Sequence, residues 1–279
     1  MRSSIPTPTL SQIAIGPFTF YFYALCIIAG IAVAIWLGDR RLRSFGNSAG
    51  LDLTGVVSDV AVIAIPAGII GGRLYHVVTS PELYFGSGGS LLAILKIWNG
   101  GLGIWGAISL GTFGAWFGYK YLLKSKPELP TFGVFLDALA PGVLLAQAVG
   151  RWGNWFNIEL FGKPSTAPWA LQVPIANRPN GYETFATFHP TFLYESLWCV
   201  TVALLLIKAD KAGFFAKAKA GTLFIAYISL YTLGRGAIEI LRIDSSTQIL
   251  GMRLNFWTSL LIFLGSTTWF ILRKLRQNR

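Results

Sequence analysis

The feature that most constrains this chain is its first stretch of sequence, which carries no charge between Arg2 and Asp39. A helix needs about 20 mostly apolar residues to cross the hydrocarbon core of a bilayer, and Phe18–Leu37 meets that requirement. The stretch is longer than the apolar part of a signal peptide, and its arginine cluster follows it instead of preceding it. We therefore expect a retained membrane span, not a cleaved leader.

Composition indicates that most of the remaining chain also faces lipid. Hydrophobic residues make up 53% of the 279 residues and charged residues only 13%, whereas a soluble domain carries about 25% charged residues. Further apolar segments are Leu53–Val78, Trp98–Tyr119, Val134–Val149, Phe192–Ile207, Thr222–Leu241 and Phe256–Leu272. We predict an all-α integral membrane protein with about seven transmembrane helices, in which residues 1–279 form a single transmembrane domain.

Basic residues cluster in alternate connections between these segments. The clusters are Arg40, Arg41 and Arg43; Lys120, Lys124 and Lys126; Lys208, Lys211, Lys217 and Lys219; and Arg273, Lys274, Arg276 and Arg279. The positive-inside rule assigns them to the cytoplasm, so we expect the N-terminus outside and the C-terminus inside. This topology accounts for the net charge of +11, and nucleic-acid binding is not expected.

The other basic residues are scattered singly along the connections assigned to the outer side. They are Arg2, Arg73, Lys96, Arg151, Lys163, Arg178, Arg235, Arg242 and Arg253. Several lie at the edge of an apolar segment, where a charge is expensive and is a candidate for function. One outer connection, residues 151–190, is long, so we expect it to contain an extracytoplasmic loop or small cap.

The densest polar motif lies in the segment Gly150–Gly162. If this segment is helical, Arg151, Asn154 and Asn157 or Ile158 share one face, and Glu159 follows directly. A guanidinium offers a rigid fork of donors that suits a phosphodiester. The structural alternative is an interfacial arginine that meets lipid headgroups, with the asparagines as helix caps.

A second motif contains Arg235, Glu239 and Arg242 at spacings of four and three residues, which place them on one helical face. An Arg–Glu–Arg stack at the end of a span can grip an anion. A purely structural ion ladder is an equal alternative, because charges within membranes commonly pair with each other.

A third motif begins with His189-Pro190 and continues to Tyr194 and Glu195. Proline is favoured at the first position of a helix, so these side chains are expected at the outer rim of a span. Histidine is the usual general base. The structural alternative is a capping histidine with a tyrosine of the aromatic belt.

Glycine-rich sequence surrounds two further candidates. Gly71-Gly72 precedes Arg73 and His76, and glycines also fill the segment Asn99–Gly106. Glycine pairs allow close approach of helices and a broken helix entry. Arg73 and His76 are candidates for substrate contact or for bonds to headgroups, and the second segment is only a weak phosphate-loop signal.

Four residues with reactive or polar side chains lie singly inside apolar segments. Asp137 requires a partner, for which we expect a structural one, and the Tyr23 hydroxyl needs a bond to the protein or to substrate. Cys26 and Cys199 read as small buried residues without a disulfide. Because the chain has two His and two Cys without ligand spacing, no metal site is expected.

These motifs together resemble one family, the prolipoprotein diacylglyceryl transferases of bacteria, nearly end to end. Gly150–Gly162 is similar to the family signature Gly-Arg-x-Gly-Asn-(x2)-Asn-x-Glu-(x2)-Gly. Further agreement comes from Tyr23, Gly72-Arg73-Leu74, Trp98-Asn99-Gly100-Gly101, His189-Pro190, Leu193-Tyr194-Glu195, and Arg235 with Glu239 and Arg242.

The resemblance implies a reaction and a setting. The diacylglyceryl group of phosphatidylglycerol is transferred to the lipobox cysteine thiol of a prolipoprotein, a thioether forms, and glycerol 1-phosphate leaves. The expected location is the bacterial plasma membrane, as a multi-pass protein. We expect no cofactor, and nothing in the sequence demands an oligomer, so a monomer is expected.

We accordingly predict which residues form the site. Predicted catalytic residues are Arg151, Arg235, Glu159 and His189. Predicted substrate-binding residues are Tyr23, Arg73, Gly100, Gly101, Asp137, Asn154, Asn157, Gly162, Tyr194, Glu195, Glu239 and Arg242.

One position departs from the pattern. Many relatives carry His in the Gly-Gly-(x3)-His-Gly stretch, where it has been considered a base, and this chain has Trp105 there. A mechanism that requires that histidine does not apply to this chain. The base is then His189, Glu159, Tyr23 or no protein group at all.

Two other function classes compete with this interpretation. A transporter or channel would explain seven spans with charged and glycine-broken helices. Against it, the charges gather at the outer ends of the spans instead of the midplane, and no internal repeat is convincing. A non-enzymatic lipid scaffold would not need a polar cluster as dense as Arg151–Glu159.

Overall fold

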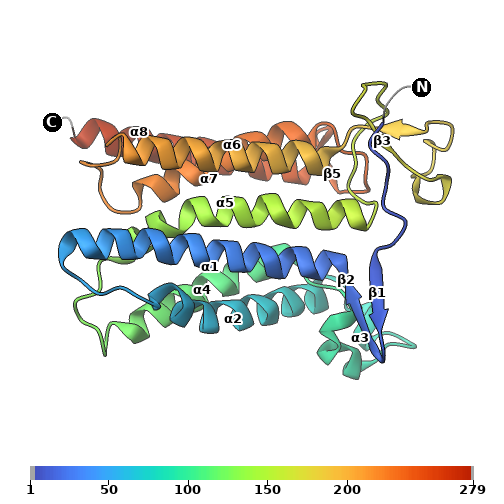
Figure 1. The fold of residues 1–279 in the computed structure, drawn as a ribbon. Coiled ribbons are helices and arrows are strands. Elements are labelled where there is room, and N and C mark those ends of the chain that lie inside the picture. Colours follow the sequence, from blue (N-terminus) through green and yellow to red (C-terminus); the bar gives the residue numbers. More distant parts are fainter. Residues whose placement is uncertain (1–3, 278–279) are drawn as a thin grey trace. The chain divides into compact units, whose positions relative to one another are not determined.

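The computed structural model describes residues 4–277 and is mainly helical (Figure 1). Arg2 and Arg279, two of the basic residues in the predicted charge pattern, lie outside the described residues. The chain forms two compact units, Met1–Gly38 with Gly133–Arg279 and Asp39–Phe132. We call them unit 1 and unit 2. The helix α1 (Phe22–Ala49) contributes residues to both.

The beginning of the first span differs from the prediction. Residues expected to open the helix instead form β2 (Phe18–Tyr21), which pairs antiparallel with β1 (Gln12–Ile15). Gly16 in the connection has a φ of 59°, a conformation that glycine adopts readily. Aromatic and β-branched residues favour strands, so the helix starts only at Phe22 and then continues past the predicted end.

In unit 1 the long helices lie side by side with alternating direction (Figure 1). They are α5 (Phe132–Phe156), α6 (Thr191–Lys211), α7 (Thr222–Glu239) and α8 (Leu254–Gln277), with the first part of α1. Their shared core includes Leu144, Cys199, Val202 and Leu223, all buried. The second cysteine is thus the inert buried residue that its apolar surroundings indicate.

Glycines let α1 approach α5 closely within unit 1. A Cβ atom at Gly30 would lie 2.8 Å from the carbonyl oxygen of Ala146, and one at Gly142 would lie 2.9 Å from that of Ala34. Backbones at this separation pack without side chains between them. The contact holds the start of α1 against the helix that carries the Gly150–Gly162 motif.

Unit 2 is built on the pair α2 (Val56–Thr79) and α4 (Ile104–Leu122). In the sequence, the connection from α2 to α4 contains α3 (Glu82–Phe85) and the short 3-10 turns η1 (Leu91–Leu95) and η2 (Ile97–Asn99). The third span was predicted to begin at Trp98, and it begins later because Gly100 and Gly101 have φ values of 83° and 76°. Such left-handed residues cannot continue a right-handed helix.

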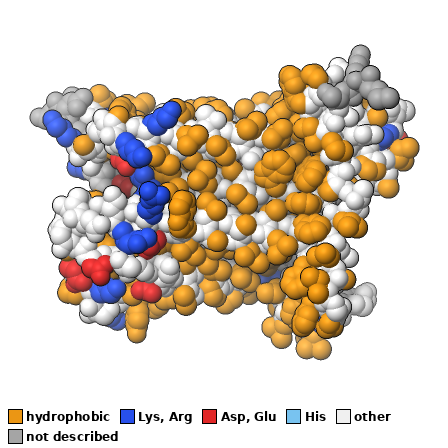
Figure 2. Space-filling view, viewed as in Figure 1, with side chains coloured by type: hydrophobic (Ala, Val, Ile, Leu, Met, Phe, Trp, Pro, Cys, Tyr) orange, Lys and Arg blue, Asp and Glu red, His pale blue; other side chains and the backbone are white. Residues whose placement is uncertain are grey.

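Five helices of the described chain are long and apolar enough to cross a membrane: α1, α2, α5, α6 and α8. The helices α4 and α7, with 19 and 18 residues, are not among these five. In unit 1, Figure 2 shows hydrophobic side chains over the middle of the helices and Lys and Arg near the end where α6 and α8 finish. This distribution is that of a helical integral membrane protein.

The described residues also contain small sheets, so the all-α prediction holds only for the spans. Besides β1 and β2, β3 (Leu171–Gln172) pairs with β4 (Thr187–Phe188), and β5 (Gln248–Ile249) pairs with β6 (Met252–Arg253). A further 3-10 turn, η3, covers Ile175–Asn177. These hairpins lie in the connections at the ends of the unit 1 helices (Figure 1).

The predicted cap is a folded segment, and it begins after Phe156, where α5 ends. Its core contains the buried side chains of Phe161, Val173 and Phe188. Ile5, near the N-terminus, extends the small sheet: its amide donates to the carbonyl oxygen of Ala170 at 2.8 Å. The N-terminal segment is therefore part of the cap.

The glycine contacts between α2 and α4 give a first prediction. A Cβ at Gly106 would lie 2.1 Å from the carbonyl oxygen of Gly71, so Gly106→Ala must push the two helices apart. We expect a loss of about 1–3 kcal/mol in the free energy of unfolding. Thermal unfolding in detergent measures it.

The matched control is Gly265→Ala in α8, where a Cβ would meet nothing within 4 Å. Helix propensity favours that change by up to about 1 kcal/mol, so the melting temperature should stay or rise. Equal destabilisation by the two substitutions would contradict the packing argument.

Candidate active site

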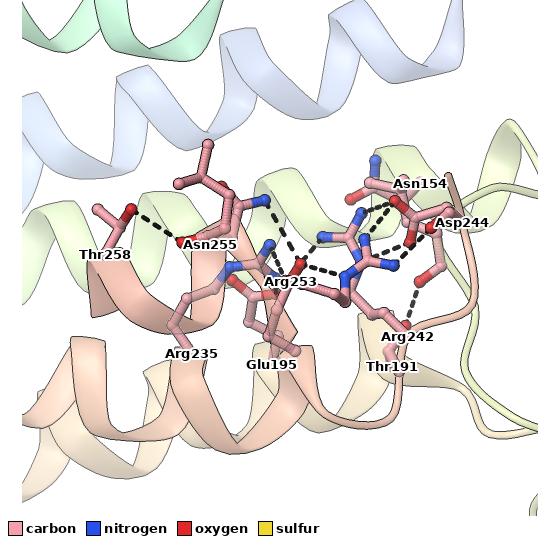
Figure 3. A network of polar contacts seen from close by, with 12 residues as sticks. Asn154, Thr191, Glu195, Arg235, Arg242, Asp244, Arg253, Asn255 and Thr258 are labelled. Carbon is pink, nitrogen blue, oxygen red and sulfur yellow. Dashed lines mark hydrogen bonds and ion pairs between the residues drawn. The ribbon is translucent and has the colours of Figure 1, made fainter. Parts of the chain in front are cut away.

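The polar residues of unit 1 converge at one end of its helices. Because the helices alternate in direction, the C-terminal ends of α5 and α7 lie with the N-terminal ends of α6 and α8 (Figure 1). Arg151 comes from α5, Glu195 from α6 and Arg235 from α7. Three segments that are distant in sequence thus supply one cluster, seen from close by in Figure 3.

Glu195 is the centre of the cluster. Its side chain is 4% exposed, and its two carboxylate oxygens bind different arginines. Oε1 lies 2.7 Å from Nη2 of Arg151, and Oε2 lies 3.1 Å from Nη1 of Arg235. The hydroxyl of Tyr231 also donates to Oε1 at 3.2 Å. One buried carboxylate therefore sets the spacing between two guanidinium groups.

Glu239 is the second carboxylate and is fully buried. Oε2 lies 2.6 Å from Nη2 of Arg235 and 3.6 Å from Nη1 of Arg242, so the predicted Arg–Glu–Arg stack is present. Arg242 reaches Glu239 from beyond the helix, because α7 ends at Glu239. Beyond the end of the helix, the carbonyl oxygen of Leu241 accepts a hydrogen bond from the amide of Lys163 at 2.8 Å.

Asp244 and Arg253 complete the cluster and were not among the predicted site residues. The Asp244 carboxylate accepts two hydrogen bonds from Arg242, both at 2.8 Å, and one from Arg253 at 2.8 Å (Figure 3). Arg253 also lies 2.6 Å from Glu239. The available signal in the sequence was that Arg253 is one of the single basic residues on the outer side. The spacing of the residues does not predict the turn between β5 and β6 that brings Arg253 back to the cluster.

These contacts govern ionisation in the loop between α7 and α8. Burial would raise the pKa of Asp244, but the hydrogen bonds and charges of Arg242 and Arg253 outweigh it and hold that pKa below its usual range. Burial likewise opposes the charge of Arg253, and its bonds to Glu239 and Asp244 still raise its pKa. Asp244 and Arg253 are therefore both charged near neutral pH.

The Gly150–Gly162 motif extends the cluster toward the cap. Nη1 of Arg151 donates to Oδ1 of Asn154 at 3.4 Å, and Nδ2 of Asn154 donates to Oε1 of Glu159 at 2.9 Å. The side-chain amide of Asn157 reaches the same oxygen at 3.3 Å. The predicted convergence of these side chains is present, although only Arg151 and Asn154 belong to the helix.

The turn after α5 is strained. Ile158 and Leu160 have φ values of 53° and 58°, and a left-handed conformation costs about 1–2 kcal/mol for a residue with a side chain. Two contacts hold the turn: the Glu159 amide donates to the carbonyl oxygen of Asn154 at 3.1 Å, and the Thr191 hydroxyl donates to that of Leu160. This turn directs the Glu159 side chain back to Asn154.

A small polar cavity opens inside the cluster. Its lining residues are Arg151, Asn154, Leu160, Thr191, Phe192, Glu195 and Arg242. Its volume is about 10 Å³, the room of about one water molecule. Arg151 is the arginine most open to its surroundings, with a side chain 24% exposed against 15% for Arg235 and 8% for Arg242.

Two other residues of the predicted site, Tyr23 and Gly162, make close packing contacts at the motif. The Tyr23 ring lies against Gly153, where a Cβ would be 2.6 Å from the ring. At Gly162 a Cβ would lie 2.9 Å from that of His189 and 3.0 Å from the carbonyl oxygen of Leu241. Gly162 is thus required by the close crossing of three chain segments, which gives it a packing function.

His189 lies where the cap meets α6. Its Nδ1 is 3.0 Å from the hydroxyl of Tyr194, which also accepts a hydrogen bond from the indole of Trp169 at 3.0 Å. The predicted pair of His189 and Tyr194 is therefore joined directly. The His189 side chain does not cap α6, because the N-cap residue is Pro190 and it has no side-chain cap hydrogen bond.

Asp137 has the structural partner that its sequence context indicates. Its carboxylate accepts the backbone amides of Gly221 at 2.7 Å and Phe224 at 2.8 Å. These contacts cap the N-terminus of α7, the opposite end of that helix from Arg235. The substrate-binding prediction for Asp137 gains no support from this position.

Arg73, in unit 2, is 7% exposed and organises the loop before α4. It donates to the carbonyl oxygens of Ala93, Ile94, Lys96, Gly100 and Gly101. A guanidinium has five N–H donors, and among the described residues these carbonyls engage all of its nitrogens. Arg73, Gly100 and Gly101 thus have structural tasks in the loop.

The fold and cluster define a class: a helical integral membrane protein with buried arginine–carboxylate pairs at one end of its bundle. Residues 9–272 match the model of the family "Prolipoprotein diacylglyceryl transferase". The chain belongs to this family, in agreement with the resemblance of its motifs.

Curated relatives agree. A Streptomyces coelicolor protein named phosphatidylglycerol–prolipoprotein diacylglyceryl transferase 2 is 49% identical over 94% of this chain and 78% of its own length. A similarly named Streptomyces griseus protein is 47% identical over 99% of this chain and 79% of its own. A similarly named protein from Bifidobacterium adolescentis is 43% identical over 96% of this chain and 79% of its own length.

The ion pairs of Asp244 predict how stability depends on pH. Because the folded pKa lies below the ordinary value of about 3.9, the carboxylate stabilises the fold above that value and loses this effect as pH falls through the folded pKa. Melting temperatures of the wild type and Asp244→Asn in detergent should differ by a constant amount from pH 7 to about pH 5. The difference should shrink below about pH 4, and a difference independent of pH would contradict the assignment.

Proposed function

We propose that this chain transfers the diacylglyceryl group of phosphatidylglycerol to the lipobox cysteine thiol of a prolipoprotein. Family membership and the printed names of the relatives support the reaction class. The observation that carries the proposal is the bridging of Arg151 and Arg235 by the buried carboxylate of Glu195. This arrangement presents two guanidinium groups at the end of a membrane bundle.

The substrate thiol is the nucleophile of this reaction, so the protein's main task is to stabilise the negative charge that develops on the leaving phosphate. The thiol sulfur attacks the glycerol carbon that carries the phosphate, a C–S bond forms, and the C–O bond to the phosphate breaks. The electron pair leaves with glycerol 1-phosphate, and the thiol proton passes to a base. Fixed guanidinium donors stabilise the negative charge that grows on the phosphate, and Arg151, the more exposed of the two, is placed to contact it first.

The proton acceptor that the geometry favours is Glu159. Asn154 joins its carboxylate to Arg151 through hydrogen bonds of 2.9 and 3.4 Å. His189 is engaged with Tyr194 at the edge of the cap. A thiol has a pKa near 8.5, and the positive field of the arginines stabilises the thiolate, which lowers the demand on the base. Trp105 occupies the position of the histidine that many relatives carry, and the proposed step does not use it.

We propose seven spans, with α4 and α7 completing the five that meet the length and hydropathy criteria. The proposed orientation has the N-terminus outside and the C-terminus in the cytoplasm of a bacterial cell. Its support in unit 1 is the separation of charges: Lys208, Lys211 and Lys274 lie at the helix ends opposite Arg151. The site then faces the outer leaflet, and we propose that a monomer suffices.

A transfer assay with Arg151→Ala tests the proposal. Purified protein, phosphatidylglycerol and a lipobox peptide are mixed in detergent, and the peptide mass is followed. The wild type should add one diacylglyceryl group to the cysteine peptide and none to a serine version. Loss of the guanidinium should lower the rate by at least about 100-fold.

The matched control is Arg43→Ala, which removes an exposed arginine that pairs with Asp39 at 2.9 Å. It should leave transfer near the wild-type level. The proposal fails if folded wild-type protein adds no mass, or if Arg151→Ala retains full activity.

Glu195→Gln tests whether the carboxylate positions the two arginines. The amide keeps the shape but not the charge, so Arg151 and Arg235 lose their common anchor, and we expect kcat to fall about 100-fold. KM for the lipid should change much less, because both arginines remain. Kinetics with varied phosphatidylglycerol separates the two parameters.

Glu183→Gln, in the exposed part of the cap, is the control and should be neutral; its carboxylate accepts the amide of Gly181 at 3.0 Å. Glu195→Asp should restore part of the rate, since it restores the charge. A Gln variant with normal kcat would remove Glu195 from the proposed machinery.

A further inference from the structure

A second cavity lies at the other end of unit 1, where α7 begins and α8 finishes. It has a volume of about 410 Å³ and is lined by Lys219, Trp269, Leu272 and Arg273. The 18 residues of α7 separate its mouth from Glu239, which is about 27 Å at a rise of 1.5 Å per residue. The cavity is therefore distinct from the arginine–carboxylate cluster.

Arg273 is held in a fixed orientation at this cavity. Nη1 donates to the carbonyl oxygen of Ala220 at 3.0 Å and to the hydroxyl of Thr222 at 3.4 Å, and the guanidinium lies 5.0 Å from the centre of the Trp269 ring. Nε and Nη2 have no hydrogen-bond partner among the residues whose side chains the structure describes. Two nitrogens of a planar fork thus remain for an external acceptor, the geometry that suits a phosphate.

The surroundings are basic. Lys219 adds a second cation to the lining, and the same ends of α6 and α8 carry Lys208, Lys211 and Lys274. The partly buried Asp137 carboxylate nearby accepts hydrogen bonds from two backbone amides at the start of α7. A ligand here meets a positive potential, as the blue side chains near the end of α6 and α8 in Figure 2 illustrate.

The remaining wall is apolar and faces outward. Trp269 is 55% exposed and Leu272 47% exposed, and both belong to α8, one of the helices that can cross the membrane. Tryptophan is favoured at the level of lipid headgroups. An inorganic phosphate would use the two cations but not this wall, whereas a phospholipid would use both.

We propose that this cavity binds an anionic phospholipid of the leaflet opposite the active site. The phosphate contacts Arg273 and Lys219, and an acyl chain runs along Trp269 toward the middle of the bilayer. Basic pockets between transmembrane helices hold anionic headgroups in this way. In the orientation proposed above, this lipid belongs to the cytoplasmic leaflet and is not the substrate.

Native mass spectrometry of the full chain in a nonionic detergent tests the proposal, with phosphatidic acid as the probe. The double variant Lys219→Gln with Arg273→Gln should weaken its binding about 25-fold, since each charge near the surface contributes about fivefold. The matched control, Lys208→Gln with Lys211→Gln, removes two charges from the same end but none from the cavity, and should bind as the wild type does. Phosphatidylethanolamine, which has no net charge, should bind weakly to all three proteins.

Two further measurements make the result decisive. Lys219→Glu leaves the Arg273 contacts intact, so it should weaken phosphatidic acid binding even if the double variant does not fold. In an Arg151→Ala background, Lys219→Gln with Arg273→Gln should still weaken the binding about 25-fold, which separates this site from the active site. Equal loss in both double variants would overturn the proposal, as would displacement of the lipid by equimolar inorganic phosphate, which would indicate a soluble anion site.

Discussion

Everything at the candidate site depends on the burial of two carboxylates, Glu195 and Glu239. A carboxylate removed from water is stable only if it is paired and hydrogen-bonded, and each of these binds more than one arginine. Arg235 bridges the two. Because the partners come from different helices, the pairs also fix how α5, α6, α7 and the start of α8 meet. In the reaction proposed above, the same contacts that hold the bundle end together position the guanidinium groups for the phosphate.

In the proposed function, an ion ladder and an anion site are not alternatives for these charges. Removing one partner of a buried ion pair is strongly destabilising. The carboxylates are therefore needed to stabilise the charged arginines in apolar surroundings. Arg151 is the member that combines a carboxylate partner with exposure and a cavity. The strained turn after α5 adds Glu159 to this end of the network, at a cost that the surrounding hydrogen bonds offset.

Glycine has two separate tasks in this fold. Gly30 and Gly106 allow helix backbones to approach, and Gly162 allows three segments to cross beneath the cap. Gly100 and Gly101 instead end the loop that Arg73 organises, through their positive φ values. Glycines that look alike in a motif therefore act through packing at some positions and through backbone conformation at others.

The sequence by itself determined the membrane class, the approximate spans and the grouping of Arg151, Asn154 and Glu159, because apolar length and short spacings are local properties. It did not reveal the strands before α1 or the late start of α4, where left-handed glycines and strand formers override hydropathy. Nor did it show that Arg253 joins the cluster, since that contact depends on the path of the chain between two helices. Only the tertiary structure decided that Arg151 and Arg235 share the carboxylate of Glu195, because pairing between distant segments is set by how the helices pack.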